Sequence, residues 1–178
     1  MIRFFDFLFS LLGLIILSPL LILLGIIIFF ENGSPLFKQY RVGYNQKLFL
    51  LIKFRTLPIN TKFAATHLVS NLSITKLGFF LRHTKFDEFP QLLNVLLGHM
   101  SLVGPRPCLP TQRTLIIERK KRGIFKVRPG MTGLAQLCSI DMSTPKFLAK
   151  TELKMIKKMN VYYYFYYILK TFFLVLKK

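Results

Sequence analysis

Asp87 and Glu88 are the two residues of this chain whose types and position best suit chemistry. The chain has 178 residues, of which 26 are Lys or Arg and 7 are Asp or Glu, so two adjacent acids stand out from a strongly basic background. Apolar residues at helical spacing follow them, and Gly98 ends this run. Because a helix tolerates proline in its first turn, Pro90 predicts that both acids lie at the N-terminus of this helix.

Two interpretations of the pair stay open on these residues alone. The free N–H groups and the dipole at a helix N-terminus favour an ionised carboxylate, and Arg82 or Lys85 would act in the same direction. An ionised aspartate can serve as a nucleophile or as a metal ligand. The alternative is a capping aspartate followed by a first-turn glutamate, a common pair that stabilises a helix and has no catalytic role.

A predicted β-hairpin supplies two cations. The segments Leu36–Val42 and Leu48–Arg55 flank a turn that contains Gly and Asn, which is a pattern typical of a hairpin. Lys53 and Arg55 alternate with Phe54 and therefore project from one face of the second strand. Two cations that project together can clamp a phosphate, and a strand edge protected by charge explains them equally well.

The segment Pro105-Arg106-Pro107 predicts another place for a phosphate. The two prolines restrict the backbone and fix the direction of the arginine guanidinium, whose planar fork suits bidentate contacts with phosphate. After it, Thr111–Arg122 predicts a helix whose basic end, Arg119–Arg122, faces solvent or lipid headgroups. Closely spaced glycines in Arg128–Gly133 then predict a loop whose backbone approaches a ligand.

The N-terminal part of the chain predicts a membrane segment. After a short polar lead, Arg3–Asp6, the run Phe7–Phe30 contains no charge. It makes roughly 35 Å of helix, enough for the hydrocarbon core of a bilayer. Ser18-Pro19 predicts a kink in its middle, where the serine hydroxyl can satisfy the carbonyl that proline frees near Ile15. A simple span and a re-entrant hairpin both fit, and in either case charge bias places the lysine-rich remainder in the cytoplasm.

The remaining segments predict a loop, two helices and two reduced thiols. Residues 58–76 are rich in Thr, Asn and Ser without periodicity and predict a mobile surface loop. Pro145–Met159 predicts a helix. Val161–Lys178, rich in Tyr, Phe and Lys, predicts a helix at the headgroup level of a membrane that packs in part into the core. Cys108 and Cys138 lack the partners that a zinc site needs and are expected to be reduced thiols in the core of a cytosolic domain.

Four motifs in sequence order, KQYRVG, KFRT, FDEFPQLLNVLLGHMSLVGPRP and VRPGMTGLAQ, resemble the bacterial sugar transferase family, the small monotopic polyprenyl-phosphate phosphoglycosyl transferases. The similarity runs from Arg3 to about Lys170. It implies that Asp87 is a nucleophile that attacks the β-phosphorus of a UDP-sugar, releases UMP and forms an aspartyl phosphosugar intermediate. It also implies that Glu88 binds Mg²⁺, which neutralises the diphosphate, and that polyprenyl phosphate then accepts the phosphosugar.

The resemblance implies further residues that bind phosphate or line the site. These are Lys53, Arg82, Pro105, Arg106, Pro107 and, as an additional basic candidate, Arg128. The resemblance favours a re-entrant helix broken at Ser18-Pro19 over a simple span. Glu152 stands where the family frequently has Asp, and Cys138-Ser139-Ile140 replaces a stretch that often holds an arginine, which leaves the nucleotide-sugar preference open.

Together these features predict an α+β, mostly helical, monotopic membrane enzyme on the cytoplasmic face of the bacterial inner membrane. Residues 1–32 would form the re-entrant helix, 33–160 the catalytic domain with a small β-hairpin, and 161–178 an interfacial amphipathic helix. The expected partners are a UDP-sugar, polyprenyl (undecaprenyl) phosphate, membrane lipids and downstream glycosyltransferases that build a glycan such as capsule or lipopolysaccharide. A catalytically silent adaptor that binds lipid phosphates is the alternative, and nucleic-acid binding is not expected because no reading motif is present.

Overall fold

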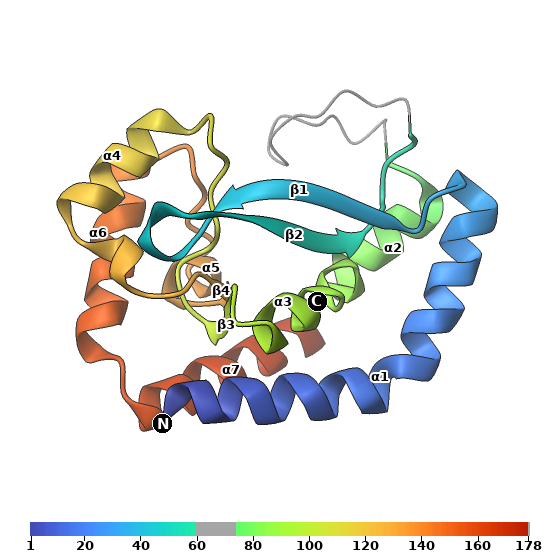
Figure 1. The fold of residues 1–178 in the computed structure, drawn as a ribbon, viewed down its shortest axis with the longest axis horizontal. Helices are drawn as coiled ribbons and strands as arrows, with labels where there is room; N and C mark the ends of the chain where they lie inside the picture. The colour runs from blue at the N-terminus through green and yellow to red at the C-terminus, as the bar shows by residue number, and fades with distance from the viewer. Residues whose placement is uncertain (60–73, 178) are drawn as a thin grey trace.

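The computed structural model describes residues 1–59 and 74–177, and these parts are mostly helical with two small sheets (Figure 1). The helices are α1 (Ile2–Asn32), α2 (Lys76–Thr84), α3 (Gln91–Leu96), α4 (Arg113–Lys121), α5 (Leu134–Leu137), α6 (Pro145–Lys158) and α7 (Val161–Leu176). The 3-10 turns are η1 (Tyr44–Gln46), η4 (Phe86–Glu88) and η5 (Ile124–Lys126), and the strands are β1 (Leu36–Val42), β2 (Leu48–Phe54), β3 (Ser101–Val103) and β4 (Gly130–Thr132). The predicted mostly helical α+β class is confirmed, whereas most of the predicted loop, residues 60–73, lies outside the described residues.

The hairpin of β1 and β2 is confirmed, and it separates two parts of the core. Its strands are antiparallel, with Leu36 opposite Phe54 at one end of the ladder. Because side chains alternate along a strand, the two faces of β2 contact different helices. Phe54 packs against Leu24 and Ile28 of α1. The other face carries Phe49 and Leu51, which pack against Val95 of α3.

α1 is one continuous helix that bends about midway along its length (Figure 1). Pro19 lies inside it, and the Ser18 hydroxyl donates to the Ile15 carbonyl at 2.8 Å, as predicted for a proline kink. Among the described residues it is the helix with the length and composition to cross a membrane, with a mean hydropathy of 3.0 over its most apolar stretch. Much of its apolar surface is exposed, including Ile16 and Phe30. These properties fit membrane association, and the re-entrant path stays a prediction.

The first turns of α1 anchor the helix to the rest of the protein rather than forming a simple polar lead. Arg3 donates to the Val95 carbonyl at 2.5 Å and to the Leu96 carbonyl at 2.8 Å, so it satisfies carbonyls at the C-terminal end of α3. Asp6 is 2% exposed. One of its carboxylate oxygens accepts three hydrogen bonds of 2.9 Å, from the Ser101 hydroxyl, the Leu102 N–H and the Tyr164 hydroxyl. The apolar helix is therefore tied to α3, β3 and α7 at once.

α7 is both a core helix and an exposed one. Tyr164 and Tyr167 are buried in a cluster that includes Phe5 and Phe9 of α1. Other apolar residues of the same helix are exposed, among them Tyr162 and Phe173. The prediction that this segment packs in part into the core is confirmed. Its contact with a membrane interface stays a prediction.

The glycines after Arg128 serve a close approach between two backbones. β3 and β4 are paired in parallel, with Ser101 opposite Gly130. A Cβ atom added at Gly130 would lie 2.0 Å from the backbone nitrogen of Gly104, which leaves no room for a side chain. Here the glycines let two strands meet, and because Gly130 also lines a cavity with Lys53 and Glu88, the approach of this backbone to a ligand stays a prediction.

Candidate active site

Asp87 and Glu88 lie in η4, between α2 and α3. Lys85 follows α2 in the left-handed conformation, with φ 64°, and turns the chain into η4. α3 begins at Gln91 with Pro90 as its N-cap residue, so the acids precede the helix by about one turn. No side-chain hydrogen bond caps η4 or α3, both of which lie within the described residues, and the capping interpretation is therefore wrong.

Asp87 is buried, with 5% of its surface exposed. Its pKa is raised to about 6, first by burial and then by the negative charge of Glu88. Lys53, Lys85 and Arg82 oppose this rise without cancelling it. The expectation that the helix terminus and nearby cations would dominate is wrong, because the loss of water outweighs them. At pH 7 the ionised form still prevails by roughly ten to one, so Asp87 can act as a nucleophile.

Glu88 has the opposite electrostatic balance, although it is adjacent in sequence. Burial by itself would raise its pKa, but Arg106, Lys85 and Lys53 outweigh burial and hold the pKa below its usual value. The Arg106 guanidinium donates to Glu88 Oε1 at 3.3 Å. Glu88 is therefore a firmly ionised carboxylate, whereas its neighbour Asp87 lies closer to its protonation point.

Lys53 and Arg82 are two further cations near Asp87. Burial lowers the pKa of Lys53, and the Asp87 charge partly restores it. The Arg82 pKa is also lowered by burial and raised by Asp87, and the Arg82 Nε–H donates to the buried Thr56 hydroxyl at 2.8 Å. Lys53 Nζ lies 5.4 Å from the centre of the Phe37 ring, which supports its position over the sheet face. The structure thus brings Lys53 and Arg82 to the acids, as the sequence predicted.

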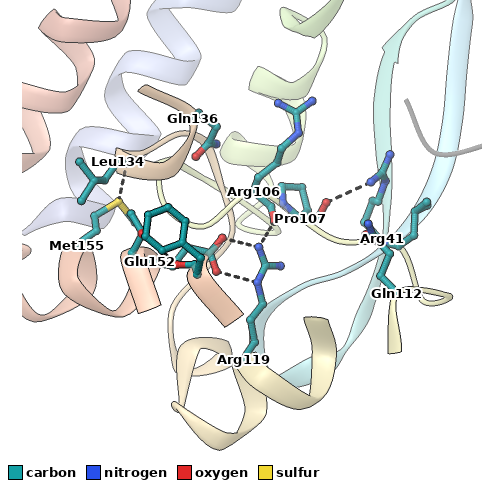
Figure 2. A network of polar contacts seen from close by, with 12 residues as sticks. Arg41, Arg106, Pro107, Gln112, Arg119, Leu134, Gln136, Glu152 and Met155 are labelled. Atoms are coloured by element: carbon teal, nitrogen blue, oxygen red, sulfur yellow. Dashed lines mark hydrogen bonds and ion pairs between the residues drawn. The ribbon is translucent and has the colours of Figure 1, made fainter. Parts of the chain in front are cut away.

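Two arginines, Arg119 and Arg41, donate hydrogen bonds to the backbone of the Pro105-Arg106-Pro107 segment (Figure 2). Arg119 Nη2 donates to the Arg106 carbonyl at 2.9 Å, and Arg41 Nη1 donates to the Pro107 carbonyl at 3.2 Å. Figure 2 shows the Arg119 guanidinium between this backbone and Glu152, to which it donates twice, at 2.8 and 2.5 Å. The prolines restrict φ, and these hydrogen bonds fix where the segment lies.

Two basic residues are placed differently from the sequence prediction. Arg119, which was expected on a solvated surface, is 2% exposed and is paired with Glu152 in the core. Arg128 does not reach the acids: its Nε–H donates to the Gly98 carbonyl at 2.8 Å, and its guanidinium lies 5.4 Å from the centre of the Tyr44 ring. Arg128 therefore holds the turn that ends α3, and its phosphate-binding role stays a prediction.

Arg41 is a site residue that sequence reasoning missed. Burial, and then the nearby Arg106 charge, lower its pKa to about 10. It pairs with Phe49 across the hairpin, and cross-strand partners share a face. Arg41 therefore shares the face of Phe49, on which Lys53 also lies by alternation along β2. The position of Arg41 on the same face of the predicted hairpin as Lys53 could have identified it from the sequence.

Two cavities adjoin Glu88, whereas Asp87 is not among the lining residues of either. The smaller, of about 20 Å³, is lined by Lys53, Arg41, Glu88 and Arg106. The larger, of about 860 Å³, is formed by η4, β4, α5 and α7 and contains Glu88 and Arg106 on its charged side. Within the described residues, two buried polar atoms have no hydrogen-bond partner, Arg41 Nε and Gln136 Oε1, and both residues line this larger cavity. The larger cavity therefore offers a hydrogen-bond donor and an acceptor without partners, as well as room for a ligand.

The acids suit a divalent cation only in company with a ligand. Among residues 1–59 and 74–177, no group of three His, Cys, Asp or Glu side chains has a metal-site arrangement. Mg²⁺ often takes just one or two protein carboxylates and completes its shell with substrate phosphates and water. Glu88, an ionised oxygen donor that lines both cavities, fits that kind of site. The two cysteines are free thiols: Cys108 is buried, as expected, whereas Cys138 is exposed, so its predicted place in the core is wrong.

Comparison with known proteins decides the family. The model of a family described as "bacterial sugar transferase" matches residues 1–178. The chain belongs to the bacterial sugar transferase family. Its motifs KQYRVG, KFRT and FDEF supply the Arg41, Lys53 and acidic groups around the cavities, so the residues that carry the family resemblance converge in space.

Members of the bacterial sugar transferase family with named functions are similar to this chain. Over 146 residues it is 41% identical to the exopolysaccharide production protein PSS of Rhizobium leguminosarum bv. phaseoli, covering 76% of this chain and 72% of that protein. It is 37% identical to the undecaprenyl-phosphate galactose phosphotransferase of Salmonella typhimurium, covering 76% of this chain and 32% of that protein. It is 38% identical to the UDP-glucose:undecaprenyl-phosphate glucose-1-phosphate transferase of Klebsiella pneumoniae, covering 76% of this chain and 30% of that protein. The chain thus spans about a third of the length of these two longer relatives.

Proposed function

We propose that this protein transfers a sugar phosphate from a UDP-sugar to polyprenyl phosphate and so starts the assembly of a lipid-linked glycan. The observation that carries the proposal is a buried aspartate, Asp87, with a pKa of about 6, beside a firmly ionised glutamate and several nearby cations. The names of the Salmonella and Klebsiella relatives support the same reaction class.

In the first step, an Asp87 carboxylate oxygen forms a bond to the β-phosphorus of the UDP-sugar. The bond between that phosphorus and the bridging oxygen breaks, and UMP leaves with the electron pair. Lys53, Arg82 and Arg106 supply positive charge for the oxygens on which negative charge develops. The product is an aspartyl phosphosugar, which explains the value of a carboxylate that is buried yet ionised at neutral pH.

In the second step, an oxygen of polyprenyl phosphate attacks the same phosphorus. The bond to Asp87 breaks, the carboxylate is regenerated, and polyprenyl-diphosphate-sugar leaves. Water must be kept from the intermediate, because hydrolysis would waste the sugar phosphate. The 5% exposure of Asp87 fits this requirement.

Glu88 is the residue that would hold Mg²⁺, which would neutralise charge on the diphosphate when bound. The Arg106 guanidinium donates a hydrogen bond to Glu88 Oε1. The hydrogen bond from Arg119 to the Arg106 carbonyl fixes the Arg106 backbone and so keeps the Arg106 guanidinium near Glu88. The segment therefore orients a cation toward the phosphates whether or not the metal is in place.

The membrane arrangement is part of the same proposal. α1 would enter the bilayer as a re-entrant helix bent at Pro19, which leaves the catalytic residues on the cytoplasmic face. Its exposed apolar surface and its anchoring through Arg3 and Asp6 support a helix that holds the enzyme against the membrane. The acceptor would then reach the site without leaving the lipid phase.

The test is UMP release by purified protein supplied with a panel of UDP-sugars, polyprenyl phosphate and Mg²⁺. Asp87→Asn should lower the rate by about a thousandfold or more, because the nucleophile is lost. Glu31→Gln removes one exposed carboxylate far from the site in sequence and should leave the rate unchanged. Undiminished turnover of the Asp87→Asn variant would exclude the nucleophile, and polyprenyl phosphate binding without UMP release from any sugar would favour the silent adaptor.

A further inference from the structure

The second half of α7 forms one wall of the cavity of about 860 Å³ beside Glu88. The α7 residues in this wall are Ile168, Thr171, Phe172, Leu174 and Val175. None of them is charged, and all except Thr171 are apolar. The wall is held in place by Thr171, whose hydroxyl donates to the Tyr167 carbonyl at 2.7 Å and lies 2.5 Å from the Thr132 hydroxyl of β4.

The charged side of the same cavity comes from other elements. Its cations are Arg41 of β1, Lys85 between α2 and η4, and Arg106 of the proline-flanked segment, and its acids are Glu88 of η4 and Asp141, which follows α5. A ligand that fills this cavity therefore meets a charged lining in which three cations outnumber two acids, and the hydrocarbon wall of α7. Such a lining suits an anionic phosphate attached to an apolar chain, since each half finds a matching surface.

A nucleotide sugar alone would make few favourable apolar contacts with the α7 wall. Its uracil, ribose and hexose carry polar groups, and placing them against Ile168 and Phe172 would deprive those groups of water without giving them partners. The apolar wall instead favours the acceptor substrate of the proposed reaction.

The exposed rim of the wall supplies a route to the lipid phase. Phe172 is 59% exposed and Leu174 is 40% exposed, although both line the cavity. α7 also packs against α1 through Tyr164 and Tyr167, so the rim belongs to a helix seated on the apolar membrane helix. A long chain can pass from the cavity over α7 and continue into lipid.

We infer that the α7 wall binds the isoprene units of the polyprenyl phosphate acceptor next to its phosphate. This inference rests on the proposed function and adds a place for the acceptor within it. The phosphate meets the Arg41 and Arg106 side of the cavity, the first isoprene units lie against Phe172 and its neighbours, and the rest of the chain remains in the membrane.

The chain offers a matched pair of variants for the test. Phe172 and Phe173 are adjacent on α7 and each is 59% exposed, but only Phe172 lines the cavity. Each variant removes one ring from the same helix, so a general loss of membrane affinity would be the same in both. The full chain in neutral phosphatidylcholine nanodiscs is titrated with a fluorescent polyprenyl phosphate. Phe172→Ala should raise the Kd about tenfold and Phe173→Ala by no more than about twofold, as expected for one lost apolar contact.

Three results would overturn the inference: equal losses in the two variants, equal competition by phosphatidic acid, or, in the Phe172→Ala variant, a higher UDP-sugar concentration for half-maximal single-turnover release of UMP without acceptor. The last result would assign the wall to the donor. Failure of the wild-type protein to release UMP would refute the proposed function, and the binding comparison would still decide the role of the wall.

Discussion

Arg106 contacts two groups of buried charges, one through its backbone and one through its guanidinium, and the two groups are built in opposite ways. Behind its backbone, Arg119 and Glu152 are 2% and 1% exposed and are joined by two hydrogen bonds. At its guanidinium, Glu88 is held at 3.3 Å, while Asp87 makes no direct side-chain hydrogen bond or ion pair with any residue in the ranges 1–59 and 74–177. The Arg119–Glu152 group is fully paired, whereas in the group at the guanidinium the Asp87 carboxylate has no direct partner among these residues.

This difference separates a pair of charges that supports the structure, Arg119 and Glu152, from a carboxylate suited to chemistry, Asp87. A buried pair with every charge engaged is rigid, and breaking it leaves an uncompensated ion. Asp87 instead feels cations at a distance, and burial holds its pKa at about 6. A carboxylate locked in a direct ion pair would be a poorer nucleophile, so the looser arrangement suits the proposed role of Asp87 as a nucleophile.

The largest effect is expected from breaking the support. Glu152→Ala leaves the Arg119 guanidinium buried without its carboxylate, which should lower the free energy of unfolding by about 3–5 kcal/mol. Glu152→Asp keeps the charge and should retain most of the stability and activity. Denaturant unfolding measures the first effect, and the KM for the UDP-sugar reports whether the Arg106 segment has moved. A Glu152→Ala protein that unfolds at the wild-type denaturant concentration would contradict the assigned support.

Replacing Asp87 should change the stability in the opposite direction, by raising the free energy of unfolding. Because burial raises the pKa of Asp87 to about 6, the folded state carries a penalty for ionising it. The sign follows from linkage: the penalty is absent below about pH 4, grows as the pH rises toward 6, and is constant above it. Asp87→Asn should therefore stabilise the protein at pH 7.5, by about 3 kcal/mol at most, and not at pH 4. Thermal unfolding at both pH values tests this, and equal melting temperatures at pH 7.5 would refute the penalty.

Local patterns in the sequence predicted most elements of the fold. Alternation and a Gly/Asn turn predicted the hairpin, and the Ser18 hydrogen bond to Ile15 follows from proline chemistry within one helix. Patterns of this kind carry no information about partners distant in the chain. Asp6 was therefore taken as part of a polar lead, although it binds β3 and α7 across 95 and 158 residues of sequence.

The site was predictable in its residue types but not in its energetics. The acids, Lys53, Arg82 and Arg106 were identified from charge, proline spacing and family motifs, and the structure brings them together. The pKa of Asp87 was expected to be low because helix-terminus effects can be read locally, whereas burial depends on the whole fold. Arg119 was misplaced for the same reason, since a lysine-rich helix end looks solvated until its partner on α6 is known.

The smallest effect, the pH dependence of the rate, distinguishes burial from helix-terminus control of Asp87. Attack needs the ionised carboxylate, so UMP release should rise with pH through about 6 and then level off. Control by the helix terminus would put this limb below pH 4 instead. Lys85→Gln removes one cation that lowers the pKa of Asp87, and should move the limb to higher pH. Lys47→Gln removes an exposed lysine that is not among the charges that shift the pKa of Asp87, and it serves as the control. A limb that stays in place in the Lys85→Gln variant would mean that solvent screens this charge from Asp87, and burial alone would then set the pKa.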